Sequence, residues 1–161
     1  MIEYYTRLED FWSKDLSNYV FRENVSTGQQ DVFHPNYSDS KNNLLQGFDD
    51  QLPEIRNDFF TSLKINEGTI SWTVIKPGNT IPLHSDTFHK LRSKYGVDVS
   101  QCLRYLIFLE DWTLGHFVEF EEVYITKWQK GDVWRFDHNS PHCAANASHR
   151  NFYTCQVNTV K

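Results

Sequence analysis

Three side chains in the sequence could together bind one metal ion. His84 and Asp86 are two residues apart, and His142 follows much later in the chain. Residues i and i+2 of a β-strand point to the same face of the sheet, so His84 and Asp86 can reach one ion. Two histidines and one carboxylate are the ligands of mononuclear iron(II) sites that keep open positions for other molecules. The sequence therefore predicts a metal site of His84, Asp86 and His142, with His142 on a separate strand.

The short His-x-Asp pattern also arises by chance, and the structural alternative is a turn carboxylate with two solvated histidines. Other histidines must then be weighed against the predicted ligands. Four of them are expected in loops, on a short helix or on a strand, without a role as ligands: His89, His116, His138 and His149. Three tryptophans are expected in the core: Trp72, Trp112 and Trp134.

The composition favours strands and gives no sign of a nucleic-acid partner. Aromatic residues make up 16% of the 161 residues, and aromatics are enriched in β-strands. The net charge of −5 is modest, and the sequence lacks the cluster of basic residues that is typical of nucleic-acid binding. Cys102, Cys143 and Cys155 are an odd number of cysteines without a Cys-x-x-Cys motif, which argues against a disulfide framework and a thiolate zinc site.

The first residues, MIEYYTRLEDFW, have neither the basic start nor the apolar core of a secretory signal. No run approaches the roughly 18 apolar residues of a membrane helix. We therefore expect a cytoplasmic protein without a membrane partner.

The chain is predicted to be one domain over 1–161, since its length lies in the usual range for a single domain. Its two parts differ in the pattern of apolar and polar residues. Residues 1–66 are expected to give helical and loop support, with helices over 8–19 and from about 52 to 63. Residues 24–43 are rich in Asn, Ser, Asp and Gln and indicate a loop.

From residue 67 the pattern changes to short strands, so the predicted fold class is mainly β, a jelly roll with N-terminal helices. A short helix over 87–95, ended by Gly96, interrupts the strands. An immunoglobulin-like sandwich is the alternative, but the expected Cys–Trp–Cys spacing is absent. Eight strands are predicted: 69–76, 80–85, 101–109, 115–121, 122–128, 132–137, 141–147 and 151–159.

Residues 71–157 resemble the catalytic core of iron(II)- and 2-oxoglutarate-dependent dioxygenases, which have a double-stranded β-helix fold. The resemblance is carried by three ordered segments: SWTVIKPGNTIPLHSD, CLRYLIFLEDW and WQKGDVWRFDHNSPHCAANASHR. The spacing of Trp128, Gly131, Phe136 and Asp137 before His142 is similar to the aspartyl/asparaginyl β-hydroxylase group. That group characteristically lacks the carboxylate that Asp86 supplies here, whereas the prolyl-hydroxylase-like branches keep it.

The resemblance implies a hydroxylase that uses Fe(II), 2-oxoglutarate and O2, with His84, Asp86 and His142 as the iron ligands. Arg150 would bind the far carboxylate of 2-oxoglutarate, because a guanidinium matches a carboxylate with two parallel hydrogen bonds. The alternative for Arg150 is an ordinary surface arginine. Arg104 interrupts an apolar strand, so it is expected either to be a second clamp or to pair with a core carboxylate.

Two other functions stay open. A cupin-type metal enzyme or binding protein would not use 2-oxoglutarate. The cupin pattern has a histidine at the position of Asp86 and a glutamate soon after, and this sequence has neither. A jelly-roll binding or structural module would bind no metal. The substrate is expected to be a small molecule or a peptide, with an amino-acid side chain favoured over a nucleic acid. Segments 24–43, 87–98 and 111–117 are expected to line its approach.

Overall fold

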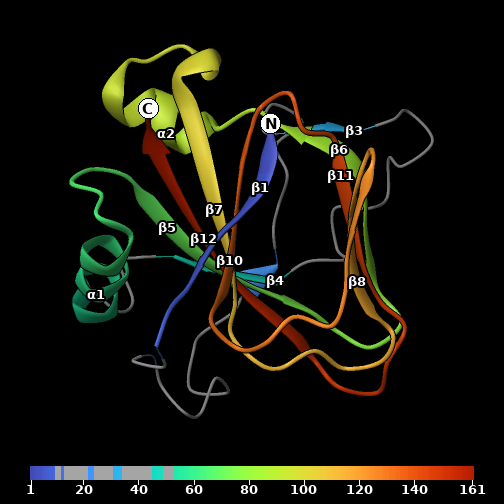
Figure 1. The fold of residues 1–161 in the computed structure, drawn as a ribbon. Helices are drawn as coiled ribbons and strands as arrows, with labels where there is room; N and C mark the ends of the chain where they lie inside the picture. The colour runs from blue at the N-terminus through green and yellow to red at the C-terminus, as the bar shows by residue number, and fades with distance from the viewer. Residues whose placement is uncertain (10–11, 13–21, 24–30, 34–44, 49–52) are drawn as a thin grey trace.

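A computed structural model describes residues 1–9, 12, 22–23, 31–33, 45–48 and 53–161. These residues form two antiparallel sheets that face each other, with few helices (Figure 1). The larger sheet has the strand order β1 (Ile2–Arg7), β10 (Asp132–Asp137), β7 (Cys102–Phe108), β12 (Phe152–Val160), β5 (Thr69–Ile75), β4 (Leu45–Phe48) and β2 (Arg22–Glu23). The smaller sheet has the order β3 (Asp31–Phe33), β6 (Thr80–Asp86), β11 (His142–Asn146), β8 (His116–Phe120) and β9 (Val123–Ile125).

The strands predicted from residue 69 onward are all present, with ends that differ by a few residues. The predicted helix near 52–63 is α1 (Pro53–Leu63), whose Phe59 and Leu63 are buried as its helical spacing indicates. The short helix is α2 (His89–Tyr95), and Gly96 ends it in a left-handed conformation (φ 67°). The mainly β prediction is therefore confirmed.

The expectation of an N-terminal part made of helices and loops is wrong for several segments. Strand β1 pairs with β10 in the larger sheet, and strands β2, β3 and β4 also lie before residue 53. The sequence of β1 is rich in tyrosine and β-branched residues, and Tyr4 meets Trp134 across the strands with ring centroids 5.9 Å apart. The helix predicted over 8–19 lies for the most part outside the described residues.

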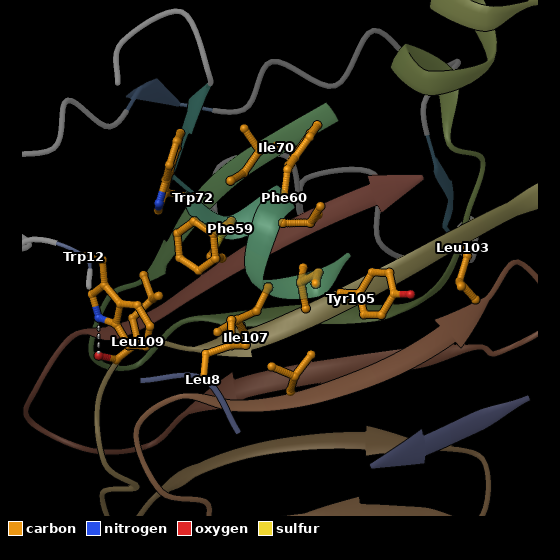
Figure 2. Packing of buried hydrophobic residues seen from close by; sticks show 14 residues of the cluster. Leu8, Trp12, Phe59, Phe60, Ile70, Trp72, Leu103, Tyr105, Ile107 and Leu109 are labelled. Atoms are coloured by element: carbon orange, nitrogen blue, oxygen red, sulfur yellow. Dashed lines mark hydrogen bonds between the residues drawn. The ribbon is translucent and has the colours of Figure 1, made fainter. Parts of the chain in front are cut away.

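The larger sheet has apolar side chains on both faces, because α1 covers one face and the smaller sheet covers the other. Figure 2 shows the cluster on the α1 side, where Phe59 and Trp72 pack together and Trp12 Nε1 donates a hydrogen bond to the carbonyl of Leu109 at 3.1 Å. A second cluster fills the space between the two sheets, with Phe108, Phe120 and other buried residues. Of the helices in the described parts of the chain, none is long and apolar enough to cross a membrane.

Strand β7 alternates between these two clusters. Leu103, Tyr105 and Ile107 pack on the α1 side, and Leu106 and Phe108 pack between the sheets. Arg104 has the same parity as Leu106, so its side chain points into the space between the sheets. A cation in that interior requires an anionic partner.

Candidate metal centre

The structure brings the three predicted ligands together at one end of the space between the sheets. Strands β6 and β11 are neighbours, and their register places His142 directly opposite His84. The ligand atoms of His84, Asp86 and His142 all lie within 4.8 Å of one another, and the three residues are at most 8% exposed. Nε2 of His84 is 3.9 Å from Oδ1 of Asp86, and Nε2 of His142 is 3.8 Å from Oδ2.

Alternation along β6 explains why two of the ligands share a face. Pro82, His84 and Asp86 are buried, whereas Leu83 between them is exposed. The pairing of β6 with β11 shifts by one residue between His142 and Ala144, so that β6 carries an extra residue there. Such a β-bulge bends a strand and re-aims its side chains, and bulges are frequent next to active sites.

Backbone carbonyls fix the orientation of both imidazoles. Nδ1 of His84 lies 2.8 Å from the carbonyl oxygen of Pro82, and Nδ1 of His142 lies 3.0 Å from that of Ser140. A carbonyl only accepts, so each Nδ1 carries a proton and donates it, and in the neutral imidazole the lone pair is then on Nε2. Histidines that bind metals characteristically donate the other ring N–H in this way. Both Nε2 atoms therefore lie within 4 Å of the same carboxylate group and are the nitrogens left to bind an ion.

Asp86 is paired with a cation. Nη1 of Arg104 lies 2.8 Å from Oδ2, and the side chains are 13% and 3% exposed. The contact is electrostatic, because Oδ2 has no hydrogen-bond partner of good geometry. Burial would raise the pKa of Asp86, but the charge of Arg104, with smaller effects of the two histidines, outweighs it and lowers that pKa. The carboxylate is therefore ionised at neutral pH, as a metal ligand must be.

His142 is neutral at neutral pH, because burial outweighs the attraction of Asp86 and lowers its pKa to about 4. Aromatic rings enclose it. The ring of Phe120 stacks against it with centroids 5.1 Å apart, and Phe136 meets it edge-on at 4.9 Å. The rings of His84 and His142 are themselves 4.4 Å apart. The cluster is therefore backed by apolar surface, which strengthens electrostatic interactions inside it.

The donor set fits a divalent transition-metal ion. Two neutral imidazole nitrogens and one ionised carboxylate are the ligands of a three-residue site that leaves other coordination positions open. Two adjacent ligands of an ion at about 2.1 Å lie roughly 3 Å apart. Nε2 of His84 and Oδ1 of Asp86 are 3.9 Å apart, which is somewhat wider, so the side chains would close slightly around an ion.

The two arginines predicted to bind a cosubstrate lie in different places. Arg104 contacts the cluster, which matches the predicted pairing with a core carboxylate. Arg150 does not. Strand β11 runs from His142 to Asn146, about 13 Å at the usual rise. The Nδ2 of Asn146, at its far end, donates to the carbonyl of Arg150 at 2.6 Å.

The exposed side chain of Arg150 therefore lies near the opposite end of the sheets from the cluster. In Figure 1 the turn before β11 is near the top, and the loop from β11 to β12 is at the bottom. Arg150 lines a surface pocket of about 510 Å³ together with other polar residues: Glu110, Asp111, Thr113, Lys130, Asn151 and Tyr153. The structure thus places Arg150 in the surroundings of an ordinary surface arginine.

His116, one of the histidines not expected to be a ligand, is buried and packs away from the cluster. Its ring stacks on Phe152 with centroids 4.7 Å apart, and its Nε2 is 2.8 Å from Oγ of Ser148. Two other residues at the site, Asn158 and Phe88, were not predicted from the sequence. Asn158 accepts a hydrogen bond from Arg104, and Phe88 lies near its guanidinium. A polar residue in the alternating strand β12 was the one available signal for Asn158.

Comparison of the sequence with models of known protein families finds no match, and neither does a search of the curated proteins. Solved structures do match in shape. A sugar phosphate isomerase from the cupin superfamily of Silicibacter pomeroyi covers 91% of this chain and 74% of its own, with a TM-score of 0.51 and 9% identity. A protein of Photorhabdus luminescens covers 74% of this chain and 77% of its own, with a TM-score of 0.48 and 13% identity.

A cupin 2 conserved barrel domain protein from Salinispora arenicola covers 73% of this chain and 76% of its own, with a TM-score of 0.45 and 16% identity. At such low identities the likeness to the isomerase concerns the fold alone. The fold is the double-stranded β-helix found in cupins, and activity has to be argued from the site itself.

Proposed function

We propose that this protein is a mononuclear iron(II) oxygenase that uses 2-oxoglutarate and O2 to hydroxylate a small-molecule or peptidyl substrate. The observation that carries the proposal is that the ligand atoms of two histidines and one ionised carboxylate lie within 4.8 Å of one another, with the side chains held by backbone carbonyls and Arg104. Two histidines and one carboxylate with open positions are the ligand set of such oxygenases. Bound iron would supply the activation of O2.

The charge of the site supports an anionic cosubstrate. Asp86 and Arg104 cancel each other, and His142 is neutral, so a divalent ion adds two positive charges that no described side chain in the cluster balances. A buried excess charge is costly unless an anion compensates for it. 2-Oxoglutarate is a dianion that chelates a metal through its carboxylate and keto oxygens. Of the two predicted arginines, Arg104 lies beside the cluster, but its charge is already balanced by Asp86.

The chain's own residues would bind and shield the reacting groups. Pro82 and Ser140 present the imidazoles in the tautomer that binds a metal. The rings of Phe120 and Phe136 exclude water from one side of the cluster. Exclusion of water protects a reactive centre from side reactions. The shape of the cluster is therefore suited to oxidation chemistry, and the preference for an amino-acid side chain as the substrate stays a proposal.

The test begins with the purified protein under anaerobic conditions. Addition of Fe(II) and then 2-oxoglutarate should produce the visible absorption band of the iron–oxoacid chelate, and the His142→Ala variant should not produce it. Admission of O2 should then release succinate slowly, even without a substrate. A screen of free amino acids, peptides and nucleobases for faster succinate release would identify the substrate class. A protein that binds iron but gives neither the band nor succinate is not a 2-oxoglutarate enzyme.

A cupin-type metal enzyme without 2-oxoglutarate is the second candidate. The observation that favours it is that neither predicted arginine is positioned to bind 2-oxoglutarate. Nε and Nη1 of Arg104 already contact Asn158 and Asp86, and Arg150 lies near the opposite end of the sheets. Such an enzyme would bind the metal and its substrate anion but show no chelate band with 2-oxoglutarate. A binding or structural module would contain no metal at all, which elemental analysis of the purified protein decides.

A further inference from the structure

Arg104 is held from two directions at the predicted metal centre. Its Nη1 lies 2.8 Å from Oδ2 of Asp86, and its Nε donates to Oδ1 of Asn158 at 2.8 Å. Asn158 faces Arg104 across the β7–β12 pair, and its Nδ2 donates in turn to Oγ1 of Thr69 at 3.2 Å. The contacts form a straight line across three neighbouring strands, β7, β12 and β5. Each partner limits the rotamers that the next can adopt.

Two aromatic rings also lie near the guanidinium. Its central carbon is 5.3 Å from the ring centroid of Phe88 and 5.9 Å from that of Phe136. Phe88 is buried and has a left-handed backbone (φ 52°, ψ 33°), although it is neither glycine nor asparagine. A bulky residue in this conformation costs free energy and persists only where its surroundings hold it. The strain lies two residues after Asp86, where it places the ring beside Arg104.

We infer that Arg104 is a positioning residue for Asp86: it occupies the Oδ2 side of the carboxylate and leaves Oδ1 as the oxygen that binds the metal. Asn158 and the rings of Phe88 and Phe136 hold the guanidinium in that pose. A carboxylate that binds through one oxygen leaves an additional coordination position open for a ligand. This inference rests on the proposed metal site and concerns how that site keeps its open positions.

Two substitutions test the inference while the positive charge stays at the site. Asn158→Ala removes the acceptor that anchors Nε. Arg104→Lys keeps a cation, but an ammonium cannot contact Asp86 and Asn158 with the fixed fork of a guanidinium. Since neither change removes the positive charge, any effect on metal binding reports the orientation of Asp86 and not a change in repulsion between that charge and the metal ion. Asn151→Ala and Arg135→Lys are the matched controls, because these residues hydrogen-bond to Tyr153 and Glu3 and not to the cluster.

The probe is Co(II), added under anaerobic conditions to the folded full-length variants, with circular dichroism to verify folding. The visible bands of Co(II) report its coordination number, since their intensity falls as coordination number rises. Asn158→Ala and Arg104→Lys should each weaken Co(II) binding by about tenfold to a hundredfold, the usual effect of losing a partner that orients a ligand. Each should also lower the band intensity, because a released Asp86 binds with both oxygens.

The controls should keep the spectrum and affinity of the unaltered protein. The double variant Arg104→Lys with Asn158→Ala should add little to either single change, because the two residues act on Asp86 as a unit. An unchanged Co(II) spectrum in both folded single variants would overturn the positioning role while leaving the metal site intact. An unaltered protein that binds no Co(II), or a His142→Ala variant that binds it equally well, would overturn the proposed function itself.

Discussion

Loading the centre with a divalent metal should stabilise the protein by an amount that depends on His142. A ligand that binds only the folded state stabilises it by about 2.7 kcal/mol at a hundredfold excess over its dissociation constant. For a chain of 161 residues, each kcal/mol corresponds to roughly 2–4 °C in Tm, so the expected shift is about 5–11 °C. The measurement is thermal unfolding with and without Fe(II) under anaerobic conditions. His142→Ala should lose the shift, since two remaining ligands hold the ion poorly.

The matched control is His116→Ala, because His116 is also buried but stacks on Phe152 away from the cluster. This variant should unfold at a lower temperature in the absence of metal, since it loses the stacking and the contact with Ser148. Its shift on adding metal should nevertheless equal that of the unaltered protein. The quantity compared is therefore the shift and not the Tm. A shift of several degrees that survives in His142→Ala would refute the assignment of the ligands.

Three further perturbations separate the roles of the neighbouring residues. Asp86→Ala should lower the free energy of unfolding of the metal-free protein by about 2–4 kcal/mol in urea denaturation, because Arg104 loses its buried partner; a loss below about 1 kcal/mol would contradict the buried pair. Arg104→Ala should raise the apparent KM for 2-oxoglutarate about tenfold or more in a succinate assay, because loss of the partner that orients Asp86 weakens the metal site on which the cosubstrate would bind, whereas Arg150→Ala should leave it unchanged. The reverse result would return the role to Arg150. Phe88→Gly should be more stable than Phe88→Ala by about 1 kcal/mol, because both lose the ring but only glycine adopts a positive φ freely; equal stabilities would mean that the left-handed backbone carries no strain.

The strands from residue 69 onward could be predicted because their signals are local. Alternation of buried and exposed residues marks β6, and the same alternation places His84 and Asp86 on one face. Gly96 marks the end of α2 by the left-handed conformation that glycine favours. Strand β1 was missed because an edge strand is stabilised mainly by its neighbour β10, which the sequence of β1 does not contain.

The position of Arg150 could not be predicted because it depends on strand length and direction. A spacing of eight residues after His142 is compatible with a return to the ligand end of the sheets or with a position at the far end. In the structure β11 ends at Asn146, and the chain turns there before β12 begins at Phe152. Arg104, in contrast, was recognisable as a charge in an apolar strand, and only its partner was open. Register decides that partner, because Asn158 lies opposite Arg104 through the pairing of β7 with β12.

A backbone carbonyl accepts a hydrogen bond from each of the two histidines. In each case the accepting carbonyl belongs to the residue two positions earlier in the chain, Pro82 for His84 and Ser140 for His142. On β6 that carbonyl lies at the bulge, and Pro82 itself has no N–H to contribute to the ladder. The carbonyl oxygen that selects the tautomer of His84 therefore lies at the irregular part of the β6–β11 pairing. The charge of Asp86 is instead balanced by a long-range partner, Arg104. The strands therefore orient the two imidazoles, and the contact between the two sheets orients the carboxylate of the proposed metal site.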